Sequence, residues 1–178
     1  MGLPKRPLPS KLIVGLLGAD RRRLDEAGER LACYFGSVDF GSDLLPFTYT
    51  DYYAGELGAP LWRQFLAFAR PFEQGALARA KLLTNALETE MSVAGRRSVN
   101  LDPGYITAAK LVLATTKDNA HRLYVGDGIY AEVTLAFVRG HFQTLPWTYP
   151  DYATEECRQV METIRARHLA QQRAGPAP

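Results

Sequence analysis

Lys11-Leu12-Ile13-Val14-Gly15-Leu16-Leu17 is a short, continuously apolar run near the start of the chain, and it decides the fold. A strand without alternation between polar and apolar residues is expected to be covered on both faces. The following Gly18-Ala19-Asp20 predicts a turn into a helix with Asp20 as its N-cap. The buried face of that helix is expected to hold Leu24, Ala27, Leu31 and Tyr34. The domain is therefore predicted to start with a covered strand and a helix packed on it.

Outward from this strand, the pattern predicts further strands at about 37–47 and 62–70. A helix follows, whose residues recur at three and four positions and form a packing face of Leu77, Ala80, Thr84, Leu87 and Met91. Residues 97–102 read as a strand. Asp102-Pro103 then suits the cap and first position of another helix, running to about Lys117.

Residues 121–145 are predicted to form a three-stranded meander, followed by a helix over about 154–170. A three-residue loop at the first turn would place Arg122 opposite Glu132 and Tyr124 opposite Tyr130. The apolar face is then expected to hold Leu123, Val125, Ile129, Ala131, Val133, Leu135 and Phe137. The polar face is expected to hold Arg122, Tyr124, Tyr130, Glu132 and Thr134.

The element order β-α-β-β-α-β, followed by α-β-β-β-α, indicates a single α+β domain with about four helices. Its sheet is predicted to be mixed but largely antiparallel, and its first half has the order of a ferredoxin-like fold. The globular domain is expected over 11–170, between a flexible N-terminal arm at 1–10 and a flexible tail at 171–178.

The composition of the 178 residues, 47% hydrophobic and 22% charged, is ordinary for one globular domain. The two cysteines lack metal or redox spacing, and no apolar run approaches the ~18 residues of a membrane span. A cytoplasmic protein with reduced thiols and no membrane contact is therefore expected. The net charge of +2 gives no whole-protein attraction to nucleic acid, so any anion site must be local.

One phrase occurs twice, 100 positions apart: Leu-Pro-Phe-Thr-Tyr-Thr-Asp-Tyr at 45–52 and Leu-Pro-Trp-Thr-Tyr-Pro-Asp-Tyr at 145–152. We interpret the copies as two strands of one sheet that leave through similar turns. Those turns would bring Asp51, Tyr52, Asp151 and Tyr152 to the rim of a ligand site. The alternative is that the aspartates only organise turns, through hydrogen bonds from their side chains to nearby backbone.

A cluster of ionisable groups follows residue 99. Asn100 and Asp102 alternate with apolar residues and so project from one face of the strand end. In the helix predicted after them, Lys110 and Lys117 lie on an apolar stripe, where an ammonium either reaches water or binds an anion. His121 is a candidate proton donor or anion contact. The alternative is that Asp102 merely caps the helix and both lysines lie at the edge of its stripe.

Two further polar groups allow more than one interpretation. Glu132 could act as a general base or metal ligand, or could simply pair with Arg122 across the hairpin on a solvated face. Lys81, Asn85 and Glu88 form a helical stripe that we interpret as a solvated face. The sequence has no zinc-ligand spacing, nucleophile elbow or phosphate-binding loop.

Six segments together resemble a known family. They are Thr50-Asp51-Tyr52-Tyr53, Asn100-Leu101-Asp102-Pro103-Gly104-Tyr105, the run from Lys110 to Asp118, His121-Arg122, the run from Gly128 to Leu135, and Trp147-Thr148-Tyr149-Pro150-Asp151-Tyr152. The chain is similar, from about 11 to 167, to the bacterial family catalogued as domain of unknown function 4416. The resemblance implies a compact, cytosolic, single-domain bacterial protein, and it supplies no activity, cofactor or catalytic residue.

The leading hypothesis is a domain that binds an anionic small molecule, such as a nucleotide or another phosphorylated metabolite. The same hypothesis includes an enzyme that acts on this molecule. The expected anion contacts are Lys110, Lys117, His121 and Arg122. Asp102 and Glu132 would hold Mg²⁺ or transfer protons, Asn100 would orient the ligand, and Tyr130 would contribute from the hairpin. Enzyme activity and oligomeric state are left open.

The rival hypothesis is a non-catalytic module that binds a protein or RNA through exposed aromatic residues. The near-neutral charge disfavours extensive contact with nucleic acid. Its candidate contacts are Tyr49, Tyr52, Tyr53, Trp147, Tyr149 and Tyr152. A concave pocket around Asp102, Lys117 and Glu132 would favour the first hypothesis, and a flat aromatic surface the second. A purely structural protein, with these groups paired internally, is the third.

Overall fold

The computed structural model describes residues 2–50 and 52–174. The strands are β1 (Ser10–Gly18), β2 (Val38–Gly41), β3 (Leu45–Phe47), β4 (Leu61–Phe72), β5 (Asn100–Ile106), β6 (Lys110–Thr115), β7 (Leu123–Gly126), β8 (Ile129–Val138) and β9 (His141–Thr144). The helices are α1 (Arg21–Phe35), α2 (Ala54–Leu57), the 3₁₀ turn η1 (Gln74–Ala76), α3 (Leu77–Glu90) and α4 (Glu155–Ala174). The strands form one sheet in the order β2-β4-β1-β5-β6-β8-β7, with β3 also pairing with β4 and β9 with β8.

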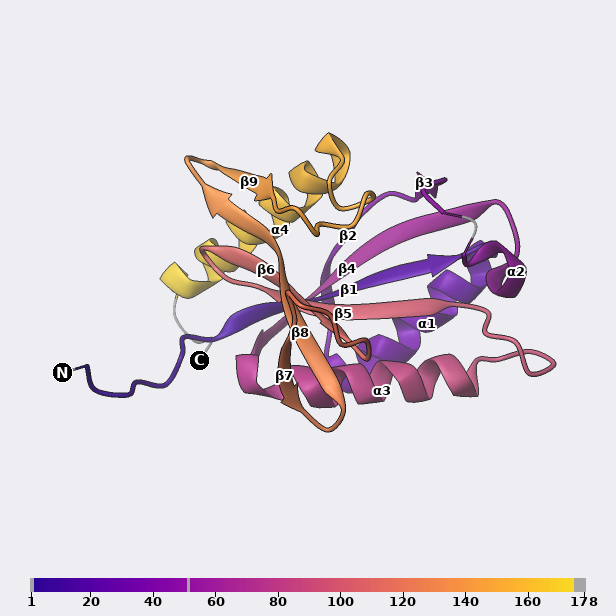
Figure 1. Cartoon of the computed structure of the whole chain (residues 1–178), viewed down its shortest axis with the longest axis horizontal. Helices are drawn as coiled ribbons and strands as arrows, with labels where there is room; N and C mark the ends of the chain where they lie inside the picture. Colours follow the sequence, from indigo (N-terminus) through magenta and orange to yellow (C-terminus); the bar gives the residue numbers. More distant parts are fainter. Residues whose placement is uncertain (1, 51, 175–178) are drawn as a thin grey trace.

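Strand β1 is central and is buried at every position, as its unbroken apolar run predicts. It pairs antiparallel with β4 on one side and with β5 on the other. Leu12, Val14 and Leu16 pack against α1 and α3, whereas Ile13 packs on the opposite face against α4. The sheet therefore lies between two helical layers (Figure 1).

The strand order β2-β4-β1-β5, with α1 and α3 on one face, is a ferredoxin-like arrangement. The connections β1-α1-β2 and β4-α3-β5 account for its two helices, and the short α2 is an addition between β3 and β4. Strands β6 to β9 extend this core along the free edge of β5. The α+β class and the ferredoxin-like order of the first half are confirmed.

The helical packing faces largely follow the sequence pattern. Asp20 caps α1, with its Oδ1 accepting a hydrogen bond from the Arg22 backbone N–H at 2.9 Å. The packing face predicted for α3 is buried throughout. Tyr34 is an exception, since it is 52% exposed. Phe35, four residues after Leu31, packs on the core in its place through an edge-to-face contact with Phe68.

The helix predicted from Asp102-Pro103 to Lys117 is wrong, because these residues form the β5–β6 hairpin. Strand β5 is largely buried, and it supplies the second of the two strands that pair with β1. At Gly104, an added Cβ would lie 2.4 Å from the Val112 carbonyl oxygen on β6. The sheet pairing outweighs the local preference of Asp-Pro for a helix start.

The first turn of the meander has the predicted register, with Tyr124 opposite Tyr130, and its second turn places Phe137 opposite Phe142. Its predicted apolar face is wrong in β7, where Leu123 is 75% exposed at the edge of the sheet. In β8 the predicted polar face is covered, since Glu132 and Thr134 are buried, whereas Tyr124 of β7 is 63% exposed. The segment 145–152 crosses this face, and the Thr148 hydroxyl donates to the Thr134 carbonyl at 2.6 Å.

Three boundaries differ from the sequence pattern. The strand predicted at 37–47 is divided into β2 and β3, and β5 begins at Asn100 rather than near residue 97. Helix α4 continues to Ala174 instead of ending near residue 170. None of the helices in the described part of the chain is both long and apolar enough to cross a membrane.

Candidate functional site

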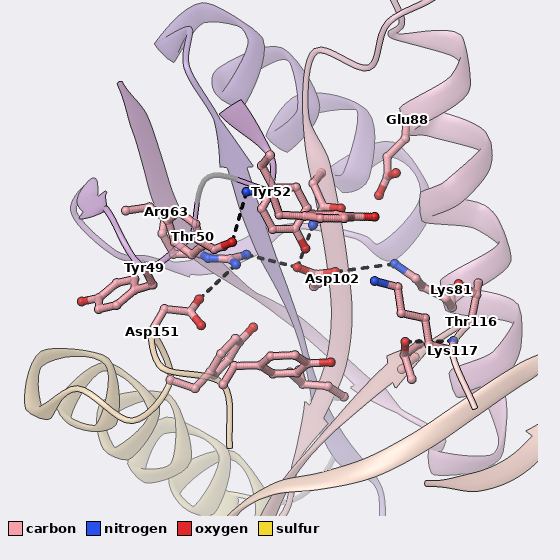
Figure 2. Close-up of a pocket in the computed structure, with 18 of the residues that line it drawn as sticks. Tyr49, Thr50, Tyr52, Arg63, Lys81, Glu88, Asp102, Thr116, Lys117 and Asp151 are labelled. Atoms are coloured by element: carbon pink, nitrogen blue, oxygen red, sulfur yellow. Dashed lines mark hydrogen bonds and ion pairs between the residues drawn. The ribbon is translucent and has the colours of Figure 1, made fainter. Parts of the chain in front are cut away.

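A cavity of about 700 Å³ opens at one end of the sheet, beside α3. Its walls come from the start of β4 and β5, the end of β6, the middle of β8, and the loops after β3 and β9. Both copies of the repeated phrase line it, through Phe47, Tyr49, Thr50 and Tyr52 from the first and Tyr149, Pro150, Asp151 and Tyr152 from the second. The two copies therefore border one cavity together with Asp102 and Glu132 (Figure 2).

Arg63 of β4 joins the parts of this cavity. Its guanidinium is buried, 3.2 Å from Asp102 Oδ2 and 3.0 Å from Asp151 Oδ2, although the second pair lacks the alignment of a hydrogen bond. It also lies 5.3 Å from the ring centroid of Phe47. Burial disfavours the charged form of Arg63, but the carboxylates of Asp151 and Asp102 outweigh this and raise its pKa. Arg63 thus remains a cation between the two copies of the phrase.

Asp102 is surrounded by donors on several sides. Asn100 Nδ2 donates to its Oδ2 at 2.8 Å, and Arg63 reaches the same oxygen. Lys81 of α3 donates to the Leu101 carbonyl at 2.9 Å and lies 3.7 Å from Asp102 Oδ1. The ammonium of Lys117, from the segment after β6, extends into the same cavity (Figure 2) and lies over the Tyr52 ring. Two cationic side chains, Arg63 and Lys81, therefore lie within 4 Å of this carboxylate, and a third, Lys117, lines the same cavity.

A second ionic group builds the wall beside α3. Glu88 accepts from the Leu101 backbone N–H at 2.7 Å and from Arg97 Nη1 at 2.9 Å. Arg97 also donates to both carboxylate oxygens of Glu56, at 2.8 and 2.6 Å. Burial raises the pKa of Glu88, against the opposing effect of the Lys81 charge and these hydrogen bonds. The charges of this group are paired with one another. Through Arg97 they connect α2 to α3 and fix the shape of this wall.

Tyrosine side chains form much of the remaining wall. Burial raises the pKa of Tyr53 to about 12, and the charge of Asp102 adds to this effect. Burial likewise raises the pKa of Tyr149 to about 12, with a further contribution from Glu132. Both phenols are therefore neutral at pH 7 and available as hydrogen-bond donors. Tyr52 is 66% exposed, and the Lys117 Nζ lies 4.9 Å from its ring centroid.

Glu132 lies in the cavity wall and is almost completely buried by a third group of contacts. Its Oε2 accepts from Arg122 Nε at 2.8 Å and lies 3.1 Å from His121 Nε2, while the Thr134 hydroxyl donates to Oε1 at 3.2 Å. Arg122 also donates to the Tyr149 hydroxyl at 2.7 Å. The cross-strand Arg122–Glu132 pair left open by the sequence is present. It lies inside the molecule, however, and not on a solvated face.

The model of the family described as Domain of unknown function (DUF4416) matches residues 8–168, which include every residue of this site. The chain belongs to this family. No curated protein and no solved structure matches it. The description of DUF4416 assigns no activity to the family.

The cavity of this DUF4416 chain brings together only part of the residue set proposed from the sequence. Those that line it are Asn100, Asp102, Lys117, Glu132, Tyr52, Asp151 and Tyr152. His121 and Arg122 contact Glu132 from behind, and Tyr130 is not among the lining residues. Asp51 lies outside the described residues.

Lys110 is separated from the site because the expected helix is a strand. It begins β6, whereas Thr115 at the other end of that strand lines the cavity. These two positions are about 17 Å apart along a strand. The expectation that Lys110 and Lys117 share one helical face is therefore wrong.

Sequence reasoning did not assign Arg63, Lys81, Glu88 or Arg97 to the site, although all four line the cavity. The interpretation of Lys81 and Glu88 as a solvated face is wrong, since they are only 7% and 5% exposed. A signal was available, because both lie three or four positions from Thr84, which belongs to the packing face of α3. Arg63 gave no comparable local signal, since its partners Asp102 and Asp151 are distant in the sequence.

The donor set does not fit the expected Mg²⁺. Hard cations need several oxygen ligands, but the oxygens of Asp102 already face Arg63, Asn100 and Lys81. Those of Glu132 face Arg122, His121 and Thr134. Within residues 2–50 and 52–174, no cluster of three or more metal-ligating side chains is found. We therefore assign no step to a metal.

Proposed function

We propose that this protein binds an anionic small molecule of about nucleotide size in the cavity around Asp102. The observation that carries the proposal is that three cations line one cavity: Arg63 and Lys81 lie within 4 Å of Asp102, and Lys117 extends into the same space. Bringing three cations together is unfavourable unless anions compensate them. Asp102, Asp151 and Glu88 lie near Arg63 and Lys81, and the phosphate or carboxylate of a ligand would compensate Lys117.

The size and lining of the cavity support a small molecule over a macromolecular partner. Its volume of about 700 Å³ falls within the usual range of small-molecule sites, roughly 300–1,000 Å³. Five of the six aromatic residues of the two phrases line this hollow, all except Trp147. The whole-chain charge of +2 also gives little attraction to a nucleic-acid backbone.

The residues would have separate roles in this function. Lys117 and Lys81 contact the anion, and Asn100 orients the polar part of the ligand. Arg63 holds the two copies of the phrase in place through Asp102 and Asp151. His121 and Arg122 act indirectly, by fixing Glu132 and Tyr149 in the wall.

The test is isothermal titration calorimetry with adenosine 5′-monophosphate, ribose 5-phosphate, glucose 6-phosphate and inorganic phosphate. Lys117→Met should weaken binding of the best ligand by about tenfold or more, as expected for loss of a charged hydrogen bond. Lys110→Met is the matched control, because that lysine lies outside the cavity. The proposal is wrong if none of the four compounds binds, or if both variants weaken binding equally.

A further inference from the structure

Four aromatic side chains of the cavity form one cluster through edge-to-face contacts. The ring centroids of Phe47 and Tyr49 are 5.5 Å apart, those of Phe47 and Tyr53 6.1 Å, and those of Tyr52 and Tyr53 5.0 Å, with interplanar angles of 71–89°. An edge-to-face contact fixes two rings without covering all their faces. Tyr49 and Tyr52 remain 43% and 66% exposed. The cluster therefore presents aromatic surface to the cavity.

The most exposed of these rings is next to a cation of the proposed anion site. Lys117 Nζ lies over the Tyr52 ring, 4.9 Å from its centroid. Tyr52 extends over the cavity toward the side from which Lys117 enters (Figure 2). An ammonium over an aromatic face is held weakly at an exposed position, and an anion attracts it more strongly. The same few side chains therefore offer a π-face and a positive charge.

From this arrangement we infer that the ligand is a nucleoside 5′-phosphate, whose base stacks on Tyr52 while its phosphate contacts Lys117. This inference rests on the proposed function and adds the chemical class of the ligand. When the phosphate binds the ammonium, Lys117 leaves the face of Tyr52, and that face becomes available to the base. One displacement thus creates both contacts. Because every base has a π-face, purines and pyrimidines should both bind.

Three compounds separate the two parts of the ligand. Adenosine 5′-monophosphate carries a base and a phosphate, ribose 5-phosphate lacks the base, and adenosine lacks the phosphate. We expect the monophosphate to bind the wild-type protein about tenfold more tightly than either of the other two, measured by calorimetry in one buffer. Stacking of a base on an aromatic side chain is usually sufficient for a difference of this size.

Substitutions at Tyr52 test which part of that side chain is used. Tyr52→Leu should weaken binding of adenosine 5′-monophosphate by about tenfold and leave ribose 5-phosphate unchanged, because only the ring contact is lost. Tyr52→Phe retains the ring and should bind the monophosphate like the wild type. The side chain is 66% exposed, so neither change should prevent folding.

Each alternative result has a distinct meaning. If ribose 5-phosphate binds as tightly as adenosine 5′-monophosphate, the stacking inference is overturned while the anion site stands. If Tyr52→Phe weakens binding as much as Tyr52→Leu, the hydroxyl and not the ring makes the contact, which also overturns it. If neither phosphate compound binds the wild-type protein, the inference is overturned, and the proposed function fails with it when glucose 6-phosphate and inorganic phosphate do not bind either.

Discussion

At the scale of single residues, Arg63 holds the site together, because its partners come from two distant segments. Asp102 lies near the start of β5, and Asp151 belongs to the second copy of the phrase. Buried carboxylates are tolerated when a paired cation and hydrogen bonds compensate them. Removal of the guanidinium would leave Asp151, which is only 8% exposed, without this cation.

Arg63→Met should therefore lower the free energy of unfolding by about 3–5 kcal/mol, the usual result of breaking a buried ion pair from one side. Urea unfolding followed by circular dichroism measures this change. Adding Asp151→Asn to the same chain should restore part of the loss, because the uncompensated charge is removed as well. A single Arg63→Met variant as stable as the wild type would contradict this account of the site.

At the scale of elements, a helix or strand was predictable where its own residues carry the pattern that forms it. The unbroken apolar run of β1, the Asp20 cap of α1 and the Tyr124–Tyr130 register all follow from neighbouring residues. The same local reasoning failed at Asp102-Pro103, where a signal typical of a helix start lies in a strand. That strand is set by β1 and β6, which sequence proximity does not reveal.

The candidate site was partly predictable for the same reason. Asn100, Asp102, Lys117 and Glu132 stand out locally as polar groups at element ends or within an apolar strand, and all four line the cavity. Arg63 was missed because its importance depends on distant partners. What decides the site is the sheet pairing, which brings distant segments to one end of the sheet.

The β5–β6 hairpin depends on a close approach of two backbones at Gly104. An added Cβ would lie 2.4 Å from the Val112 carbonyl oxygen and 2.6 Å from Leu113 Cδ2. Gly104→Ala should cost about 3 kcal/mol of stability, because the strands must separate. Gly75→Ala is the control, since no atom lies within 4 Å of its added Cβ. Urea unfolding of both variants should show a large loss only for Gly104→Ala, and equal losses would refute this explanation.

At the scale of the whole molecule, the face of the sheet opposite α1 and α3 is closed by α4, which also joins the two ends of the chain. Lys11 at the start of β1 is buried and donates to Gln171 Oε1 of α4 at 2.7 Å. It also contacts Asp39 and the Phe68 carbonyl. His168 of α4 is only 4% exposed, and its Nε2 has no hydrogen-bond partner among the described residues. The α4 layer therefore contains a buried imidazole without a hydrogen-bond partner at Nε2 among the described residues.

This imidazole should make the closed fold sensitive to acid. Burial lowers the pKa of His168 from its ordinary 6.5, and the positive charges of Lys11 and Arg165 lower it further. Below pH 6.5 the unfolded chain then binds more protons than the folded one, so stability is lost as the pH falls from 6.5 toward the folded-state pKa.

The urea concentration at the unfolding midpoint of the wild type should consequently decrease as the pH is lowered from 7.5 to 5.5. This range lies above the ordinary titration of carboxylates. His168→Leu, which places an apolar side chain in the same layer, should reduce this fall. His141→Leu serves as the control, because that side chain is 75% exposed and its removal should leave the fall intact. If the wild type and His168→Leu lose stability in parallel across this range, His168 does not make the α4 layer sensitive to acid.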